Sequence, residues 1–187
     1  MTKLEKIARE IRNCKECKKR TSGRAVPGEG NPKAKILFVG EAPGKKEAET
    51  GKPFIGRSGK LLTQLLNSIK LGRNDVFITS PVKYYPGMRT PTDKEIDHGK
   101  IHLLKQIGAI RPTLIVLLGG VAHKTLIGKV KISDVHGKTL KKDKVIYFST
   151  FHPAAALRFP YIKELMKKDF KKLERLKITA TVAIFKQ

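Results

Sequence analysis

The sequence predicts an α/β protein, a three-layer α/β/α sandwich built on a central, mostly parallel four-stranded sheet. Four short apolar runs, at residues 36–39, 76–79, 113–118 and 145–150, have the composition of buried strands. Amphipathic helical patterns fill the intervals, and loops rich in glycine, proline or serine follow the ends of the runs. A length of 187 residues with 40% hydrophobic content suits one domain with one sizeable core.

The expected helices share apolar side chains spaced three or four residues apart, and they cover residues 2–14, 57–69, 92–108, 121–126 and 161–176. Thr2 and Thr92 each precede a glutamate by three residues, and this capping-box pattern marks two of the helix starts. Residues 129–144 are basic and punctuated by glycine, which predicts a hairpin or loop. The apolar and β-branched residues of 177–187 predict an edge strand or a docked tail.

The charge of the chain indicates its class of partner. Forty Lys and Arg residues against sixteen Asp and Glu residues give a formal net charge of +24. Phosphate contacts release counterions, so such a charge favours nucleic acid. The alternatives are a lysine-rich thermophile surface and an acid-adapted protein, but glutamate should then rise with lysine. No apolar run reaches the roughly 20 residues of a membrane span, and no signal peptide is visible. We expect a cytoplasmic protein that does not bind membranes and is a monomer.

The turn after the first strand is the leading candidate for a site. Residues 40–44 contain two glycines and a proline, which end strand pairing where open α/β sheets bind ligands. Glu41, Glu47 and Phe54 are delivered to this edge. From these residue types alone, a connecting loop with solvated glutamates explains the stretch equally well.

Two long motifs resemble those of a known protein family. Gly40-Glu-Ala-Pro-Gly-Lys-Lys-Glu47, followed by Gly51-Lys-Pro-Phe-Ile-Gly-Arg-Ser-Gly-Lys-Leu-Leu62, resembles the first motif of the family-4 uracil-DNA glycosylases, the thermophile and archaeal branch of that superfamily. Phe151-His-Pro-Ala-Ala-Ala-Leu-Arg158 resembles the late His-Pro motif of the same family.

The likeness covers most of the chain, from Cys14 to about Leu176. It implies one uracil-DNA glycosylase-like domain over residues 1–176, with residues 177–187 as a C-terminal extension. The same three-layer topology follows from the resemblance and from the apolar runs.

The resemblance also implies roles for the motif residues. Glu41 and Glu47 would stabilise positive charge on the deoxyribose and position water, and His152 would donate a hydrogen bond to the departing base. The residues that would contact the flipped base through their backbone or ring are Gly40, Ala42 and Phe54. The residues that would shape the pocket or contact DNA are Pro43, Gly44, Pro153, Ala154, Leu157 and Arg158, with Leu157 as a wedge into the duplex.

Ser80 departs from the family pattern. It follows the second strand, where the family has an asparagine whose amide reads the edge of uracil. A serine hydroxyl is shorter and can rotate to suit more than one edge. Either base selection is altered, or Ser80 only ends the strand and a neighbouring backbone group reads the base.

Cys14 and Cys17 form a Cys-x-x-Cys pair, which in an intracellular protein indicates metal, cluster or redox chemistry. In the resembled family these cysteines hold half of a [4Fe-4S] cluster. The other two ligand positions align with Tyr84 and Gly99, which offer no thiolate. We therefore expect the cluster to be lost, leaving free thiols or a bridged remnant, and catalysis to require no cofactor.

His98 and His102 lie four residues apart on an expected helix. This spacing can bind a metal, but without a third ligand it is more often a coincidence. His98 is the one substitute for a missing cluster ligand near Gly99.

The sequence therefore predicts a monofunctional DNA glycosylase that flips out a deaminated base, uracil first, and hydrolyses its N-glycosidic bond. The alternative is a lesion-binding or DNA-binding homologue with weak or altered base specificity, as Ser80 would allow. A redox or metal protein built on Cys14 and Cys17 is a third interpretation. In each case the expected partner is DNA.

Overall fold

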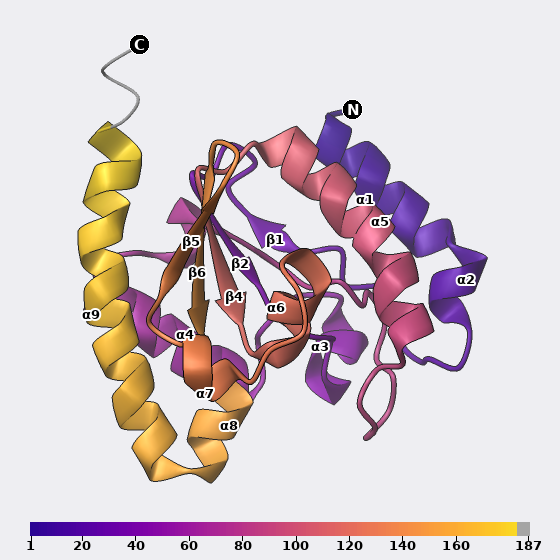
Figure 1. Ribbon diagram of the computed structural model, residues 1–187. Helices are drawn as coiled ribbons and strands as arrows, with labels where there is room; N and C mark the ends of the chain where they lie inside the picture. Colours follow the sequence, from indigo (N-terminus) through magenta and orange to yellow (C-terminus); the bar gives the residue numbers. More distant parts are fainter. Residues whose placement is uncertain (183–187) are drawn as a thin grey trace.

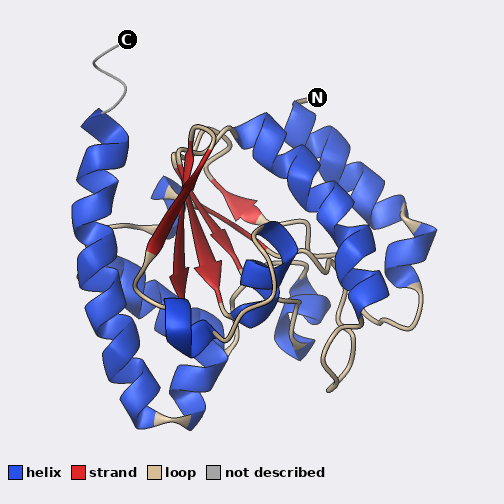
Figure 2. Ribbon diagram, viewed as in Figure 1, coloured by secondary structure: helices blue, strands red, loops and turns tan. Residues whose placement is uncertain are grey.

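The computed structural model describes the backbone of residues 1–182 and the side chains of residues 1–176 (Figure 1). Its centre is a sheet in the order β1-β3-β2-β4-β6-β5. Figure 2 shows this sheet between two helical layers, so the predicted three-layer α/β/α class is confirmed.

The four predicted strands form the middle of the sheet and run parallel: β3 (Phe77–Thr79), β2 (Ile36–Val39), β4 (Leu114–Leu118) and β6 (Val145–Thr150). All four side chains of β2 and all five of β4 are buried, as central parallel strands require. Two edge strands, β1 (Glu29–Gly30) and β5 (Thr139–Lys142), pair antiparallel with β3 and β6.

The prediction of four strands was therefore too low, since the described residues form a mixed sheet of six. β1 is only two residues long, which is too short for any periodicity. Every residue of β5 is exposed, so the strand lacks the apolar alternation that marks a half-buried strand. Residues 129–144 were expected to form a hairpin or loop; β5 within them forms a hairpin with β6, and α7 (Ile132–Val135), which was not predicted, precedes it.

One face of the sheet is covered by α4 (Arg57–Ser68), α8 (Pro153–Arg158) and α9 (Pro160–Val182). Leu62 and Leu66 of α4 and Phe170 of α9 are fully buried against Phe38 and Phe148 of the strands. These apolar positions are the ones whose helical spacing predicted the helices.

The opposite face is covered by α5 (Asp93–Ile110) and α6 (Gly120–Leu126), with α1 (Lys3–Asn13) packed along α5. Three shorter helical segments complete the fold: α2 (Lys15–Lys18), α3 (Lys45–Thr50) and a 3-10 helix at Arg73–Asp75. The predicted capping boxes at Thr2 and Thr92 are both formed.

The helix α9 extends to Val182. The predicted edge strand is therefore wrong for residues 177–182, where no glycine or proline stops the helix that precedes them. Residues 183–187 of that predicted extension lie outside the described part of the chain. No described helix combines the length and apolar character that crossing a membrane requires.

Candidate active site at the carboxyl edge of the sheet

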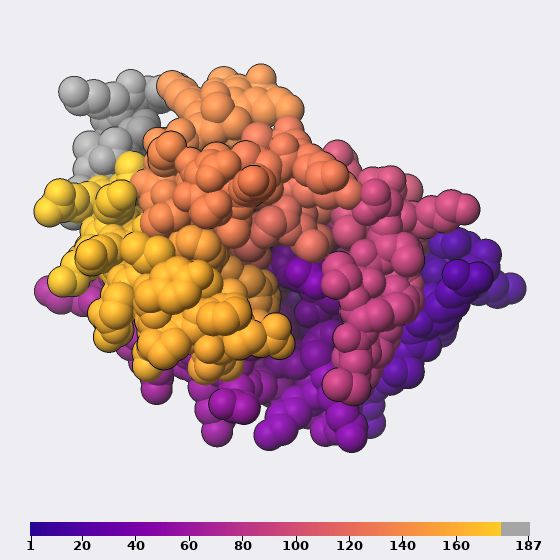
Figure 3. Space-filling view, turned by 60° about the horizontal axis from the view of Figure 1, so that its bottom comes forward, coloured from indigo at the N-terminus to yellow at the C-terminus, as the bar shows by residue number. Residues whose placement is uncertain are grey.

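The register of the sheet brings the loops of the candidate site together. Val39 is paired with Thr79 of β3 and with Leu117 of β4, and Leu118 is paired with Thr150 of β6. The strands therefore end level with one another, and the segments that follow them share one edge. Figure 3 shows a recess in this part of the surface, between the yellow-orange and pink segments.

The recess contains a pocket of about 440 Å³. Its lining includes most of the residues predicted from the motifs: Glu41, Ala42, Pro43, Gly44, Glu47, Phe54, Ser80, His152 and Ala154. Another wall comes from the 85–89 segment, through Tyr85, Pro86, Gly87 and Arg89, and the basic side chains of Lys46 and Arg57 also line the pocket. The rest of the predicted set lies outside the lining. Gly40 is buried beneath Phe54, Pro153 is buried at the start of α8, and Leu157 and Arg158 are exposed on that helix.

His152 occupies the N-cap of α8, directly after β6. The backbone N–H of Ala154 donates to its Nδ1 at 3.1 Å, so the neutral ring carries its proton on Nε2. Nε2 is buried and has no hydrogen-bond partner among the described residues. Burial also lowers the pKa of His152 to about 4. The ring is thus a neutral donor near neutral pH.

The position of His152 is supported from behind by a buried acid. Asp169 of α9 is 1% exposed, accepts from the hydroxyl of Thr150 at 2.7 Å and lies 3.1 Å from Nδ1 of His136. The His136 ring contacts the Phe151 ring, with 4.6 Å between the centroids and the ring planes tilted by 39°. This network holds the end of β6, the segment from which His152 projects.

Phe54 lies over Gly40 and beside His152. Its ring centroid is 5.7 Å from that of His152, and a Cβ on Gly40 would come within 2.6 Å of the ring. Glycine at position 40 therefore allows the aromatic ring to lie directly on the end of β2. This arrangement leaves the ring as one wall of the pocket.

The Phe54 turn is held from both sides. Phe54 has a φ of 52°, which is unusual for a residue with a side chain. Oε1 of Glu47 accepts from the backbone N–H groups of Ile55 and Gly56, each at 2.8 Å. On the other side, Arg73 donates to the carbonyl oxygens of Pro53 and Phe54 at 2.7 and 3.1 Å.

Glu41 has a different environment from Glu47. Its side chain is half-buried in the pocket lining, and no described residue donates a hydrogen bond to its carboxylate. Burial raises the pKa of Glu41. The pocket therefore presents one free carboxylate, Glu41, and one that braces a loop, Glu47.

Ser80 lines the pocket, but its hydroxyl is engaged locally. It donates to the carbonyl oxygen of Val82 at 2.7 Å, and the residue is 6% exposed. The expectation of a freely rotating hydroxyl is therefore wrong: with its proton committed to Val82, Ser80 can offer only its lone pairs to a base.

The structure also corrects the interpretation of the histidines and the ligand positions. Cys14, Cys17, His98 and His102 lie together, with their ligand atoms all within 4.8 Å of one another. The two histidines therefore have two further candidate ligands beside them. The sequence did not link them to the cysteines, which lie more than 80 residues earlier and come close only where the N-terminal helices pack on α5.

Neither aligned ligand position takes part in this group. The hydroxyl of Tyr84 donates to the carbonyl oxygen of Arg12 at 3.0 Å. A Cβ on Gly99 would come within 2.1 Å of the carbonyl oxygen of Pro81, so glycine there allows α5 to pack closely on that loop.

The sequence was also compared with those of known protein families and proteins. A sequence profile of the uracil DNA glycosylase superfamily matches residues 27–175. The chain belongs to this superfamily. It is 45% identical to a type-4 uracil-DNA glycosylase of Sulfurisphaera tokodaii, over 96% of this chain and 87% of the relative. Type-4 enzymes of Saccharolobus solfataricus and Archaeoglobus fulgidus are 44% and 42% identical, over 93% and 94% of this chain and 86% and 94% of those proteins.

The resemblance to the family-4 glycosylases is therefore confirmed. Arg73 is a supporting residue that the sequence did not indicate, because an arginine preceding a strand carries no signal that it reaches back 20 residues to a loop.

Proposed function

We propose that this protein is a uracil-DNA glycosylase, which hydrolyses the N-glycosidic bond between uracil and deoxyribose in DNA. One observation carries the proposal: a neutral histidine with an unpartnered Nε2 donor shares a pocket with a free, half-buried carboxylate. The type-4 relatives carry this activity in their names, and the pocket supplies the groups that it needs.

The reaction separates charge, and the two groups match the two charges. As the C1′–N1 bond breaks, its electron pair leaves with N1 and negative charge spreads to O2 of uracil. We assign Nε2–H of His152 to donate a hydrogen bond to O2, which a neutral ring does without transferring its proton. The Glu41 carboxylate then stabilises the positive charge on the sugar. Water adds to C1′ from the face where Glu41 orients it, and a water proton passes to the carboxylate or to solvent.

The remaining residues bind and orient the base. Phe54 would stack on the flipped ring, which contributes affinity with little selection between bases. The backbone of Ala42 would contact the base, while Pro43, Gly44 and Ala154 shape the pocket. Gly40 lies outside this lining and would act by making room for the Phe54 ring. Glu47 is a positioning residue in this scheme, because its carboxylate holds the loop that carries Phe54.

The surface beside the pocket suits an extruded nucleotide. Leu157 is 40% exposed on α8, whose N-cap is His152, so its side chain can fill the space that a flipped base leaves. Arg158 follows it and, with Lys46 and Arg57 at the pocket, supplies positive charge for phosphates. We propose that a single chain acts on DNA and that excision requires no cofactor.

Single-turnover cleavage of an oligonucleotide with one uracil tests the proposal, with alkali converting abasic sites into strand breaks. Wild type should release uracil, and Glu41→Gln and His152→Asn should each lose about 10²-fold or more in rate, a typical cost of removing one electrostatic group. Lys60→Gln, an exposed charge change on α4, is the matched control and should retain the rate.

Gel-shift binding of the same oligonucleotide distinguishes the alternative of a binding-only homologue. Retention of both Glu41 and His152 in one pocket favours the enzyme. A protein that shifts uracil-containing DNA, produces no alkali-labile sites and is indifferent to both substitutions would refute the glycosylase assignment.

A further inference from the structure

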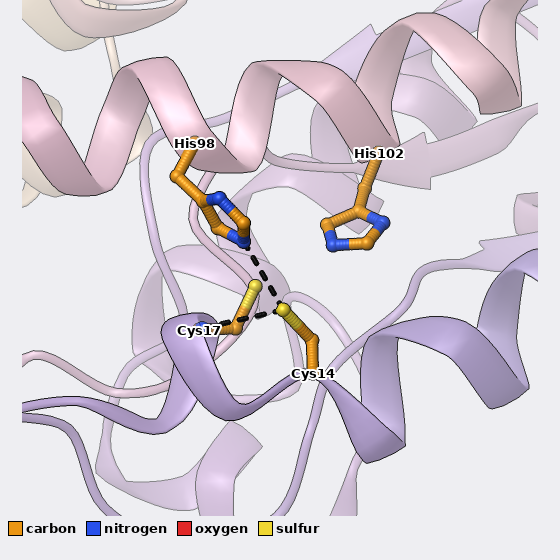
Figure 4. Close-up of side chains that lie close together, drawn as sticks. All are labelled: Cys14, Cys17, His98 and His102. Carbon is orange, nitrogen blue, oxygen red and sulfur yellow. Dashed lines mark hydrogen bonds between the residues drawn. The ribbon is translucent and has the colours of Figure 1, made fainter.

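A second cluster of reactive side chains lies away from the base pocket, where the N-terminal helices meet α5 (Figure 4). Cys14 is the residue between α1 and α2, and Cys17 lies in α2. His98 and His102 are one turn apart on α5 and face these cysteines. Sγ of Cys14 is 3.1 Å from Nε2 of His98, and the two histidine rings meet edge to face at 5.6 Å.

His102 gives an independent indication that something is bound here. The residue is 7% exposed, and neither of its ring nitrogens has a hydrogen-bond partner among the described residues. A buried polar group without a partner is costly, and native structures usually satisfy it with protein, water or an ion. Both cysteines are free thiols, so no disulfide consumes the sulfur ligands.

The spacing of the ligand atoms distinguishes one ion from a cluster. Around a tetrahedral ion with bonds of about 2.3 Å to sulfur and 2.0–2.1 Å to nitrogen, ligand atoms lie up to about 3.8 Å apart. The four candidate ligand atoms lie within 4.8 Å of one another, so small side-chain rotations would bring them to that spacing. In a four-iron cluster each thiolate binds a different corner of the cube, and in a two-iron His₂Cys₂ centre the imidazoles and thiolates bind different irons. Both arrangements hold their ligands farther apart than one ion does, so neither fits this group.

We propose that Cys14, Cys17, His98 and His102 bind a single tetrahedral divalent ion of the zinc class. The two thiolates balance the charge of the ion, and four protein ligands leave no open position, as in a structural site. The site would replace the iron–sulfur cluster that the family resemblance implies. This proposal does not rest on the base pocket or on any step of uracil excision.

The ion would fasten α1 and α2 to α5. The chain leaves α2 into the loop in which Ser22 pairs with Tyr85, and residues 85–89 form one wall of the base pocket. Fastening the helices would therefore also hold this wall in place. Loss of the ion should loosen the N-terminal helices first and weaken DNA binding through the wall.

Metal analysis of the untagged, full-length protein tests the proposal. We expect about one zinc per chain, no acid-labile sulfide and a colourless preparation. Titration of the chelator-stripped protein with Co²⁺ should give the intense visible bands of a tetrahedral site and thiolate-to-cobalt charge transfer, both saturating at one equivalent. Zinc should displace cobalt and raise the Tm of the stripped protein.

His102→Gln and Cys17→Ser should each lose the stoichiometric zinc and the zinc-dependent rise in Tm. His123→Gln is the matched control, because His123 is also 7% exposed but lies on α6, where its Nδ1 contacts the carbonyl of Gly128 at 2.8 Å. This variant should keep one zinc per chain even if its Tm falls.

Each contrary result is recognisable without a variant. Brown protein with iron and labile sulfide would show that a cluster forms and would overturn the proposal. Protein that binds neither zinc nor cobalt stoichiometrically, or that purifies with a Cys14–Cys17 disulfide and a Tm indifferent to zinc, would overturn it equally.

Discussion

Replacing Glu47 by glutamine and by alanine separates two roles that a carboxylate in this pocket can have. Its Oε1 accepts two backbone N–H groups of the Phe54 loop at 2.8 Å, and the side chain is 9% exposed. If Glu47 acts by holding this loop, a glutamine of nearly the same size should preserve much of its function. If the negative charge itself acts on the sugar, glutamine should fail as alanine does.

The magnitude follows from the two hydrogen bonds. Hydrogen bonds to a charged group are worth about 1.5–3 kcal/mol each, and neutral ones about 0.5–1.5 kcal/mol. Because the two bonds share one oxygen, we expect Glu47→Ala to lower the free energy of unfolding by about 2–4 kcal/mol rather than by the full sum. The hydrogen bonds hold Phe54 at a strained φ of 52°. When they are lost, the backbone can relax at this residue, which offsets some of the lost free energy. Glu47→Gln should lose about 1–2 kcal/mol.

The assay is urea unfolding alongside single-turnover uracil excision at saturating enzyme. With the loop released, Phe54 no longer lies fixed beside His152, and Glu47→Ala should lose about 10²-fold in rate, since small misplacements cost that much. Glu47→Gln should stay within about tenfold of wild type. Arg73→Ala, which releases the same turn from its other side, should resemble Glu47→Ala.

The Glu47→Gln variant also gives the result that would refute a purely positioning role. If Glu47→Gln loses as much rate as Glu47→Ala while its stability remains within about 1 kcal/mol of wild type, the charge of Glu47 acts directly on the reaction.

Four further predictions concern the same pocket. The pKa of about 4 keeps His152 neutral, so a plot of kcat/KM against pH should show no histidine step near about pH 6.5. In acid, kcat/KM should fall as Glu41 takes up a proton, because burial raises the pKa of this carboxyl group. Because the unfolded His152 binds protons more readily, urea-unfolding stability should fall as pH drops from about 6.5 to about 4, less steeply in His152→Asn. Gly40→Ala should lose about tenfold or more in rate, with about 1–3 kcal/mol of stability, because its methyl group would lie 2.6 Å from the Phe54 ring; an unchanged rate would show that the ring is free to move. Ser80→Asn adds a donor and an acceptor, so it should raise the ratio of uracil to hypoxanthine excision, and an unchanged ratio would make Ser80 a bystander.

Much of the fold could be predicted because its signals are local. The four central strands are apolar throughout, and the capping boxes at Thr2 and Thr92 mark their helices within four residues. The strand β5 could not be predicted in the same way, because an exposed edge strand of Thr, Leu and two Lys has no buried face to impose alternation. Residues 177–182 continue the helix α9 because no glycine or proline ends it before them. Their β-branched composition favours a strand and therefore led to the wrong prediction.

The site residues that belong to a sequence motif could be predicted, whereas those brought together only by tertiary packing could not. Most of the motif residues meet in one pocket because the strands that precede them end in register. The brace of Arg73, the Asp169–His136 pair behind β6 and the Cys–His group arise from side chains that are distant in sequence. No local pattern could link Cys14 to His102, since their proximity depends on how α1 and α2 pack on α5.

The most direct measurement is excision from end-labelled duplexes that carry a single uracil, hypoxanthine or xanthine, treated with hot alkali, with wild type beside Glu41→Gln and His152→Asn. The proposed function predicts strand breaks at uracil with wild type and a loss of about 10²-fold or more with each variant. Wild-type protein that binds these duplexes but leaves all three bases in place would contradict it.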